Sequence, residues 1–309
     1  MEPIIFEPIY MTRVWGGRTL ETRYQRQLPD SQPYGESWEL SDREHEQSVV
    51  SSGTYQGLTL HELWTTQREK VFGEGLTGNR FPLLIKILDA RDDLSIQVHP
   101  PESIASTLGG EPKTEMWYIA DRDPGTKLYL GFRTGVGRAE FEASLRDGSV
   151  ADKVHAVKPE VGESIFIPSG RLHAIGAGAL IYEIQQNSDT TYRVFDWNRI
   201  GLNGTPRDLH VEKSMQSIDF DDFEPGMDLP KGHILASCPY FQVEEHSLIN
   251  GESFSSSSDR FAIVTVVSGK VSSQDGKEFR DGDFFLLPRG ASPLKATGDS
   301  RILVTTIPA

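Results

Sequence analysis

The chain is dominated by short apolar segments that end at turn-forming residues. These segments are rich in β-branched and aromatic residues and stop at Gly, Pro or Asp, which is typical of strands in a sandwich or barrel. On this basis strands are predicted at residues 81–90, 94–100, 114–120, 126–132, 163–170, 179–186, 238–248, 260–271 and 283–290. Helical periodicity is confined to residues 59–73, 137–148 and 206–218. We therefore predict a mainly β fold with a few short helices.

Two segments of the chain repeat one pattern without a gap. They are GESIFIPSGRLH at residues 162–173 and GDFFLLPRGASP at residues 282–293, each with a turn glycine, a mostly apolar strand and a Pro-x-Gly turn. The strand-like segments upstream also correspond, so that Glu115 aligns with Ala262 and His173 with Pro293. We expect two copies of one β unit, of which only the first keeps these polar side chains.

Length and composition fit two globular domains. The chain has 309 residues, of which 37% are hydrophobic, enough to form more than one core. Acidic residues, Pro and Gly gather between residues 219 and 232, as in a linker. We therefore expect a first domain at residues 1–225 and a second at residues 226–309.

Charge and cysteine content narrow the class of partner and the compartment. A formal charge of −14 argues against nucleic acid or an anionic membrane surface as a partner. The single cysteine, Cys238, excludes an internal disulfide and a cysteine-based zinc site, which fits a reducing compartment. No apolar run approaches the roughly 20 residues that span a bilayer, and the N-terminal segment lacks the features of a signal peptide. We expect a cytoplasmic protein.

The predicted strand at residues 94–100 carries candidate chemistry. Ser95, Gln97 and His99 share one face of it, because side chains on a strand alternate with a period of two. Glu115 opens the next predicted strand, and a barrel would bring it and His173 alongside. Imidazole, carboxylate and amide oxygen are ligands of a borderline divalent metal, and two histidines with a glutamate form a common catalytic zinc set.

These segments resemble known motifs. Gly162, Pro168, Gly170 and His173 match the second cupin motif, and Gln97-x-His99 resembles the first with Gln in place of a His. Together, the segments LSIQVHP, KTEMWY, FIPSGRLHAI and NSDTTYRVFDWNR are similar to the type I mannose-6-phosphate isomerases in their short bacterial form. The resemblance covers most of the chain, since VWGG and GESWELS near the start fit as well.

The resemblance implies a fold and an activity. It implies two cupin (jelly-roll β-barrel) domains, the first catalytic with helical insertions and the second a degenerate copy without metal ligands. One Zn²⁺ per chain would be held by Gln97, His99, Glu115 and His173. The implied reaction is the reversible isomerisation of D-mannose 6-phosphate to D-fructose 6-phosphate through an enediol, which needs proton transfer and stabilisation of negative oxygens. The expected partner is a small phosphorylated sugar, and the expected assembly is a monomer or a weak homodimer.

Further site residues are also implied by the resemblance. Ser95, Arg193 and Arg199 fall where the family contacts phosphate or has basic equivalents, although an ion pair with Asp196 is an alternative for Arg199. Trp15 packs in the core or forms a wall of the pocket. The candidates for catalysis are Lys113, which a nearby metal would give a lowered pKa, Glu183 and Arg193, and the sequence does not decide among them.

Two other functional classes stay open. Two histidines and a carboxylate with open positions also occur in cupin non-haem iron oxygenases. A non-catalytic sugar-phosphate-binding cupin is the third class, because the second copy shows that the unit tolerates loss of the polar set. The remaining histidines have no supporting pattern and are interpreted as structural: His45, His61, His155, His210, His233 and His246.

Overall fold

A computed structural model describes residues 1–308 and divides the chain into two compact units. The central unit comprises Tyr10–Ser37 and Lys86–Asp228, and the terminal unit comprises Met1–Ile9, Trp38–Ile85 and the residues from Leu229 onward. Residues 1–9 and 38–85, which the predicted boundary assigns to the first domain, thus belong to the same unit as the C-terminal segment. The division into a catalytic domain at 1–225 and a degenerate domain at 226–309 stays a prediction.

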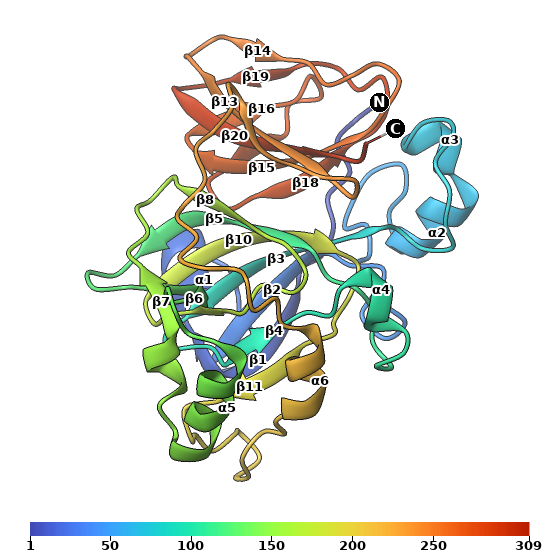
Figure 1. The fold of residues 1–309 in the computed structure, drawn as a ribbon. Coiled ribbons are helices and arrows are strands. Elements are labelled where there is room, and N and C mark those ends of the chain that lie inside the picture. The colour runs from blue at the N-terminus through green and yellow to red at the C-terminus, as the bar shows by residue number, and fades with distance from the viewer. Residues whose placement is uncertain (309) are drawn as a thin grey trace. The chain divides into compact units, whose positions relative to one another are not determined.

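The central unit contains a six-stranded and a five-stranded sheet (Figure 1). The larger sheet has the order β1 (Ile9–Gly17), β2 (Tyr34–Leu40), β3 (Leu83–Ala90), β10 (Ala179–Gln186), β5 (Glu115–Arg122) and β8 (Ser164–Ile167). The smaller sheet has the order β11 (Tyr192–Phe195), β4 (Ile96–Val98), β9 (His173–Ile175), β6 (Leu128–Phe132) and β7 (Val154–Val157). The helices are α1 (Thr19–Tyr24), α4 (Glu102–Ala105), α5 (Arg138–Asp147), α6 (Val211–Ser217) and the 3₁₀ turn η1 (Val150–Lys153).

The core of the central unit lies between its two sheets. Trp117 on β5 and Ile181 on β10 belong to the same buried cluster as Leu130 on β6 and Ile175 on β9. A second buried cluster joins β4 and β11 to α5 and α6, so these helices cover part of the smaller sheet. The outer face of β4 is thereby covered, whereas Gln97 on its inner face is only half-buried.

The terminal unit has the same two-sheet plan. One sheet has the order β12 (Ile234–Ser237), β13 (Gln242–Leu248), β20 (Ser300–Thr306), β15 (Ala262–Ser268) and β18 (Phe284–Leu287). The other has the order β14 (Ser253–Phe254), β19 (Leu294–Ala296), β16 (Lys270–Ser272) and β17 (Glu278–Arg280). Its helices are α2 (Leu60–Thr66) and α3 (Arg68–Val71), and α2 begins at a capping box formed by Thr59 and Glu62.

The internal repeat predicted from the sequence is present in the strand pairing. Glu115 on β5 lies opposite Ile167 on β8, and Ala262 on β15 lies opposite Leu287 on β18, as the sequence alignment requires. The turn glycines repeat too, because both Gly162 and Gly282 adopt a positive φ of 91° and 83°. The two copies therefore share one backbone plan and differ in the side chains placed on it.

The predicted fold class is confirmed, with one qualification about closure. All nine predicted strands and all three predicted helical segments contain regular structure of the expected type, and the sequence patterns missed the short helices α1 and α4. Among residues 1–308 no sheet closes on itself, so each cupin-like unit is an open two-sheet sandwich instead of a closed barrel. None of the described helices is long and apolar enough to cross a membrane.

The terminal core gives a test of the fold. Phe285 is fully buried and stacks on Phe279 with ring centroids 3.8 Å apart. Phe285→Ala removes this contact and leaves a cavity, so we expect a loss of about 3–5 kcal/mol in the free energy of unfolding, measured by urea denaturation. Leu229→Ala is the control, because this side chain is 88% exposed and its loss should change stability by less than about 0.5 kcal/mol. Equal stability of the two variants would contradict the described core.

Candidate active site

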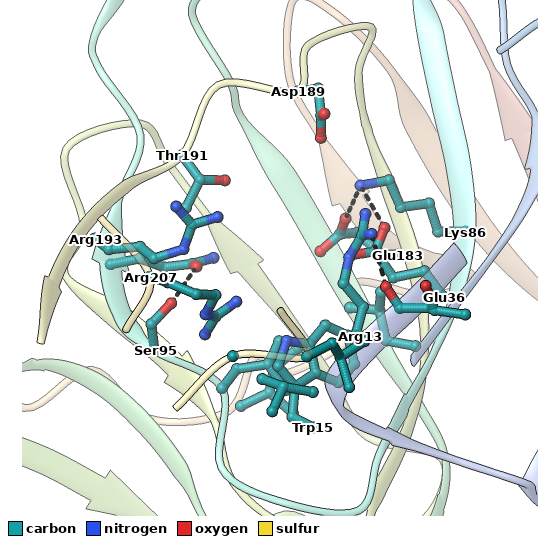
Figure 2. Close-up of a pocket in the computed structure, with 18 of the residues that line it drawn as sticks. Arg13, Trp15, Glu36, Lys86, Ser95, Glu183, Asp189, Thr191, Arg193 and Arg207 are labelled. Atoms are coloured by element: carbon teal, nitrogen blue, oxygen red, sulfur yellow. Dashed lines mark hydrogen bonds and ion pairs between the residues drawn. The ribbon is translucent and has the colours of Figure 1, made fainter. Parts of the chain in front are cut away.

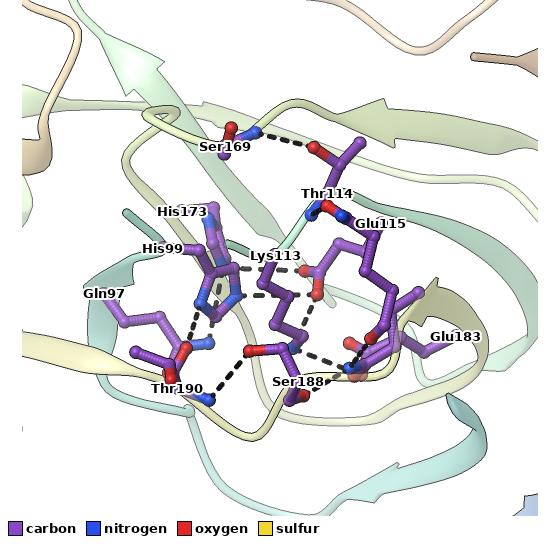
Figure 3. Close-up of polar contacts among 12 residues, drawn as sticks. Gln97, His99, Lys113, Thr114, Glu115, Ser169, His173, Glu183, Ser188 and Thr190 are labelled. Carbon is purple, nitrogen blue, oxygen red and sulfur yellow. Dashed lines mark hydrogen bonds and ion pairs between the residues drawn. The ribbon is translucent and has the colours of Figure 1, made fainter. Parts of the chain in front are cut away.

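Three side chains from distant parts of the sequence converge inside the central unit (Figure 3). His99, Glu115 and His173 each offer one ligand atom, and these atoms all lie within 4.8 Å of one another. His99 Nε2 is 3.5 Å from Glu115 Oε2, and His173 Nε2 is 3.6 Å from Glu115 Oε1. All three side chains are almost completely buried. The geometry is that of a compact set of metal-ligating groups.

The two imidazole rings are oriented by backbone carbonyls. His99 Nδ1 lies 2.8 Å from the carbonyl oxygen of Thr190, and His173 Nδ1 lies 2.9 Å from that of Arg171. A carbonyl only accepts hydrogen bonds, so each Nδ1 donates and each neutral ring keeps its lone pair on Nε2. Both Nε2 atoms face Glu115, which is the arrangement that a metal ligand needs.

The electrostatics of this set also suit a cation. Burial, reinforced by the charge of Lys113, lowers the pKa of His99, and burial lowers the pKa of His173 to about 3. Burial alone would raise the pKa of Glu115, but Lys113 and His99 hold it well below its usual range. His99 Nε2 and Glu115 Oε1 are buried without a hydrogen-bonding partner in the described chain, whereas Glu115 Oε2 has the ammonium of Lys113 at 2.7 Å. Neutral imidazoles and an ionised carboxylate with one unpartnered oxygen therefore fit a divalent metal.

Gln97 lies beside this set. It pairs with His173 across β4 and β9, and its Nε2 is 3.3 Å from His173 Nε2. Its Oε1 accepts a hydrogen bond of 3.2 Å from Ser95 Oγ. A half-turn of the amide exchanges its oxygen and nitrogen, which would present Oε1 to the same point. The structure thus brings together all four side chains that the sequence suggested as ligands.

Side chains of alternating charge form a series of ion pairs in the central unit, and this series ends at Glu115. The ion pairs join Arg13 to Glu36, Glu36 to Lys86, Lys86 to Glu183, Glu183 to Lys113, and Lys113 to Glu115, with N–O distances of 2.8, 3.4, 3.7, 3.5 and 2.7 Å. All of these side chains except Arg13 are at most 10% exposed. Alternation lets each buried charge face an opposite one.

Within this series of ion pairs the pKa values of Lys113 and Glu183 are both raised. Burial opposes the charge of Lys113, but the carboxylates of Glu115 and Glu183 outweigh it and raise its pKa. The lowered pKa expected for this lysine beside a bound metal stays a prediction. Burial, followed by the charge of Glu115, raises the pKa of Glu183, whose Oε2 accepts a hydrogen bond of 3.0 Å from Trp117 Nε1. Lys113 is an ammonium, whereas Glu183 is a carboxyl group with an increased affinity for protons.

A cavity of about 490 Å³ adjoins these groups (Figure 2). Glu36, Lys86 and Glu183 lie on one side of it, and Ser95, Arg193 and Arg207 lie on the other. Gln97 and Lys113 also line it and connect it to the ligand set. Trp15 is 3% exposed and belongs both to the core and to the cavity wall, so the two readings of this residue are compatible.

Of the two arginines predicted to contact phosphate, the structure places only Arg193 at the cavity. Arg193 lines the cavity opposite Gln97 on the neighbouring strand, and its Nε is buried without a hydrogen-bonding partner among residues 1–308. Arg199 is not among the lining residues, because its guanidinium pairs with Asp196 at 2.7 Å and with Asp92 at 3.1 Å. The alternative that the sequence left open, an ion pair with Asp196, is what the structure contains.

Sequence reasoning missed several lining residues. Lys86 is a charged residue in a strand whose every position is buried, and such a residue needs a reason to be there. Arg13 directly precedes VWGG and Glu36 lies within GESWELS, the two segments near the start that fitted the resemblance. Arg207 lies in a polar loop and gave no signal of its own.

Comparison with known proteins places this geometry in a family. A family model described as phosphomannose isomerase type I, catalytic domain, matches residues 5–125. The mannose-6-phosphate isomerase ManA of Bacillus subtilis is 36% identical over 316 residues, which cover 98% of each chain. A crystal structure of the mannose 6-phosphate isomerase from Bacillus subtilis has a TM-score of 0.89 at 32% identity and covers 99% of this chain and 100% of that one.

A more distant structure shares only the fold. It is a mannose 6-phosphate isomerase in its zinc-bound holo form, with a TM-score of 0.78 at 17% identity over the whole of both chains. The near relatives match from end to end, and the resemblance found in the motifs is thereby confirmed. The chain belongs to the type I mannose-6-phosphate isomerases, a family of aldose-ketose isomerases.

Proposed function

We propose that the protein interconverts D-mannose 6-phosphate and D-fructose 6-phosphate by metal-dependent proton transfer through an enediol. The observation that carries this proposal is the buried His99–Glu115–His173 set with its unsatisfied atoms, next to a cavity that holds both proton-transfer groups and arginines. The names of the near relatives supply the substrate.

The proposed metal is one zinc ion per chain. His99, Glu115 and His173 would hold it, with the amide oxygen of Gln97 as a fourth ligand. Zinc is bound in the more distant structure, and this donor set suits it. When bound, the ion acts as a Lewis acid that stabilises negative charge on the substrate oxygens.

For the proton transfer between C2 and C1 we propose Glu183 as the base. It faces the cavity, and its raised pKa matches a group that must take up and return a proton. Lys113 keeps its proton, so its ammonium holds the carboxylates of Glu115 and Glu183 in place and adds positive charge near the developing enediol oxygens. Arg193 and Ser95 line the opposite wall and are proposed to bind the phosphate group.

Removal of the metal is the first test. We expect dialysis against a chelator to abolish isomerisation of mannose 6-phosphate and added zinc to restore it. His99→Ala should lower zinc content and activity together, because it removes a ligand. His155→Ala removes a half-buried histidine of the same unit that is neither a ligand candidate nor a cavity-lining residue, and this variant should retain both. Full activity of the metal-free protein would refute the proposal, and iron with oxygen uptake would favour an oxygenase.

The base is tested by Glu183→Gln. The amide keeps the size of the side chain and can no longer accept the C2 proton, so kcat should fall about 10²- to 10⁴-fold. Zinc content and KM should remain close to those of the unaltered protein, and exchange of the C2 hydrogen with deuterated water should fall in parallel with kcat. Glu160→Gln, at an exposed carboxylate paired with Arg122, is the matched control. Undiminished exchange in Glu183→Gln would assign the proton transfer to another group.

The proposed binding of the phosphate group by Arg193 is tested by Arg193→Ala. Hydrogen bonds to charged groups contribute about 1.5–3 kcal/mol, so kcat/KM for mannose 6-phosphate should fall roughly ten- to a hundredfold. Zinc should be retained, because the guanidinium is not one of the ligand groups. Loss of zinc from this variant would place Arg193 in the support of the metal set and contradict its proposed role.

A further inference from the structure

One buried carboxylate organises the loop that follows β11. Asp196 is 5% exposed and pairs with two arginines at once. Arg207 binds it with two groups, Nε to Oδ2 at 2.7 Å and Nη2 to Oδ1 at 2.6 Å. Arg199 binds the same Oδ1 through Nη2 at 2.7 Å. Two hydrogen bonds to one carboxylate fix the plane of the Arg207 guanidinium.

The two arginines have different surroundings despite their shared partner. Arg199 has a second carboxylate, Asp92 at 3.1 Å, so its charge is met on two sides. Arg207 has only Asp196 as an ion-pair partner in the described chain, and it lines the cavity. With Nε and one N–H of Nη2 directed at Asp196, three N–H donors of Arg207 stay available to a ligand.

Arg193 shares this side of the cavity with Arg207 (Figure 2). No ion pair of Arg193 occurs within residues 1–308, and its Nε is buried and unsatisfied. Burial and then the charge of Arg207 lower the pKa of Arg193, which reflects two like charges close together. The carboxylates of Asp196 and Asp189 offset part of this repulsion, but neither forms an ion pair with Arg193 in the described chain, whose formal charge is −14. An anion would therefore find two cationic groups on this side of the cavity.

The backbone of the loop is built to bring Arg207 back to Asp196. Trp197 and Asn198, directly after Asp196, both adopt left-handed φ values of 56° and 53°. This conformation costs about 1–2 kcal/mol per residue away from glycine, so something must hold it. The Trp197 indole donates a hydrogen bond of 2.7 Å to the carbonyl of Leu94, and a bridge between Ile200 and Pro206 closes the loop. The reversal therefore has a defined anchor at each end.

We propose that Arg207, together with Arg193, receives the anionic group of the substrate, and that Asp196 positions Arg207 for this purpose. Arg199 then has a structural role in the loop, although it lies nearer to Arg193 in the sequence. The identity of the anion as a sugar phosphate rests on the proposed function, whereas the pairing of the two arginines around an anion rests on the geometry alone.

The experiment compares Arg207→Gln with Arg199→Gln in the zinc-loaded protein. Both variants remove one arginine from Asp196, but only the first removes a guanidinium from the cavity. The measurements are KM and kcat for mannose 6-phosphate, zinc content, and the affinity for inorganic phosphate by calorimetry. We expect Arg207→Gln to weaken phosphate affinity and raise KM by about tenfold or more, with kcat and zinc content retained, since a charge-assisted contact is lost. Arg199→Gln should change both affinities much less.

A double-mutant cycle tests the positioning role of Asp196. Asp196→Asn should raise KM in the same direction as Arg207→Gln, and the Asp196→Asn/Arg207→Gln variant should be no weaker than Arg207→Gln alone, because Asp196 acts through Arg207. Additive effects would overturn this role. Equal weakening by Arg199→Gln, or unchanged phosphate affinity in Arg207→Gln, would overturn the assignment of Arg207.

Two further measurements cover the cases in which Arg207→Gln does not fold or the zinc-loaded protein is inactive. If Arg207→Gln does not fold, Arg207→Lys keeps the charge and loses the fork, and unchanged phosphate affinity in that variant would refute the inference. Phosphate binding is measured without turnover, so an inactive zinc-loaded protein would refute the proposed function while the comparison of the two arginine variants still decides the role of Arg207.

Discussion

The site depends on one buried negative charge, the carboxylate of Glu115. A carboxylate withdrawn from water is costly unless opposite charge or hydrogen bonds compensate it. In the described chain the ammonium of Lys113 meets this charge at Oε2, whereas Oε1 is buried without a hydrogen-bonding partner. The two imidazoles beside them are neutral and direct lone pairs, not protons, toward the same point. This arrangement of donor atoms suits a divalent cation, and the alternating ion pairs that follow Lys113 balance the charge of its ammonium.

The pairing register of three strands aligns Arg193 with the candidate metal ligands. Arg193 on β11 lies opposite Gln97 on β4, which in turn lies opposite His173 on β9. Residues directly opposite one another in antiparallel strands share a face, so a phosphate-binding candidate, an amide and a metal-ligand candidate form one row. A shift of one residue in either pair would turn that side chain to the face covered by α5 and α6. Register therefore sets the distance between Arg193 and the candidate metal ligands, whereas the loop after β11 sets the position of Arg207.

The sequence predicted those parts of the site that belong to local patterns. Gln97 and His99 alternate on one strand, and His173 follows a Pro-x-Gly turn that recurs in the second copy, so their positions could be read from spacing. The series of ion pairs could not be predicted from spacing, because Arg13, Glu36 and Lys86 come from three strands whose contact depends on the sheet order. The raised pKa of Lys113 also depends on Glu183, a residue 70 positions away on a strand that pairs with β5. Arg199 and Arg207 look alike in sequence, and only the reversal at Trp197 and Asn198 decides which of them reaches the cavity.

The terminal unit shows which of these features the fold itself requires. Its β15 and β18 pair in the same register as β5 and β8, with Ala262 at the position of Glu115 and Pro293 at that of His173. The backbone plan is thus compatible with an apolar residue where the central unit buries a carboxylate. Well-packed apolar groups are often as stabilising as a buried ion pair, or more so. A carboxylate at this position is therefore not a requirement of the backbone plan, and its burial in the central unit fits the proposed metal site.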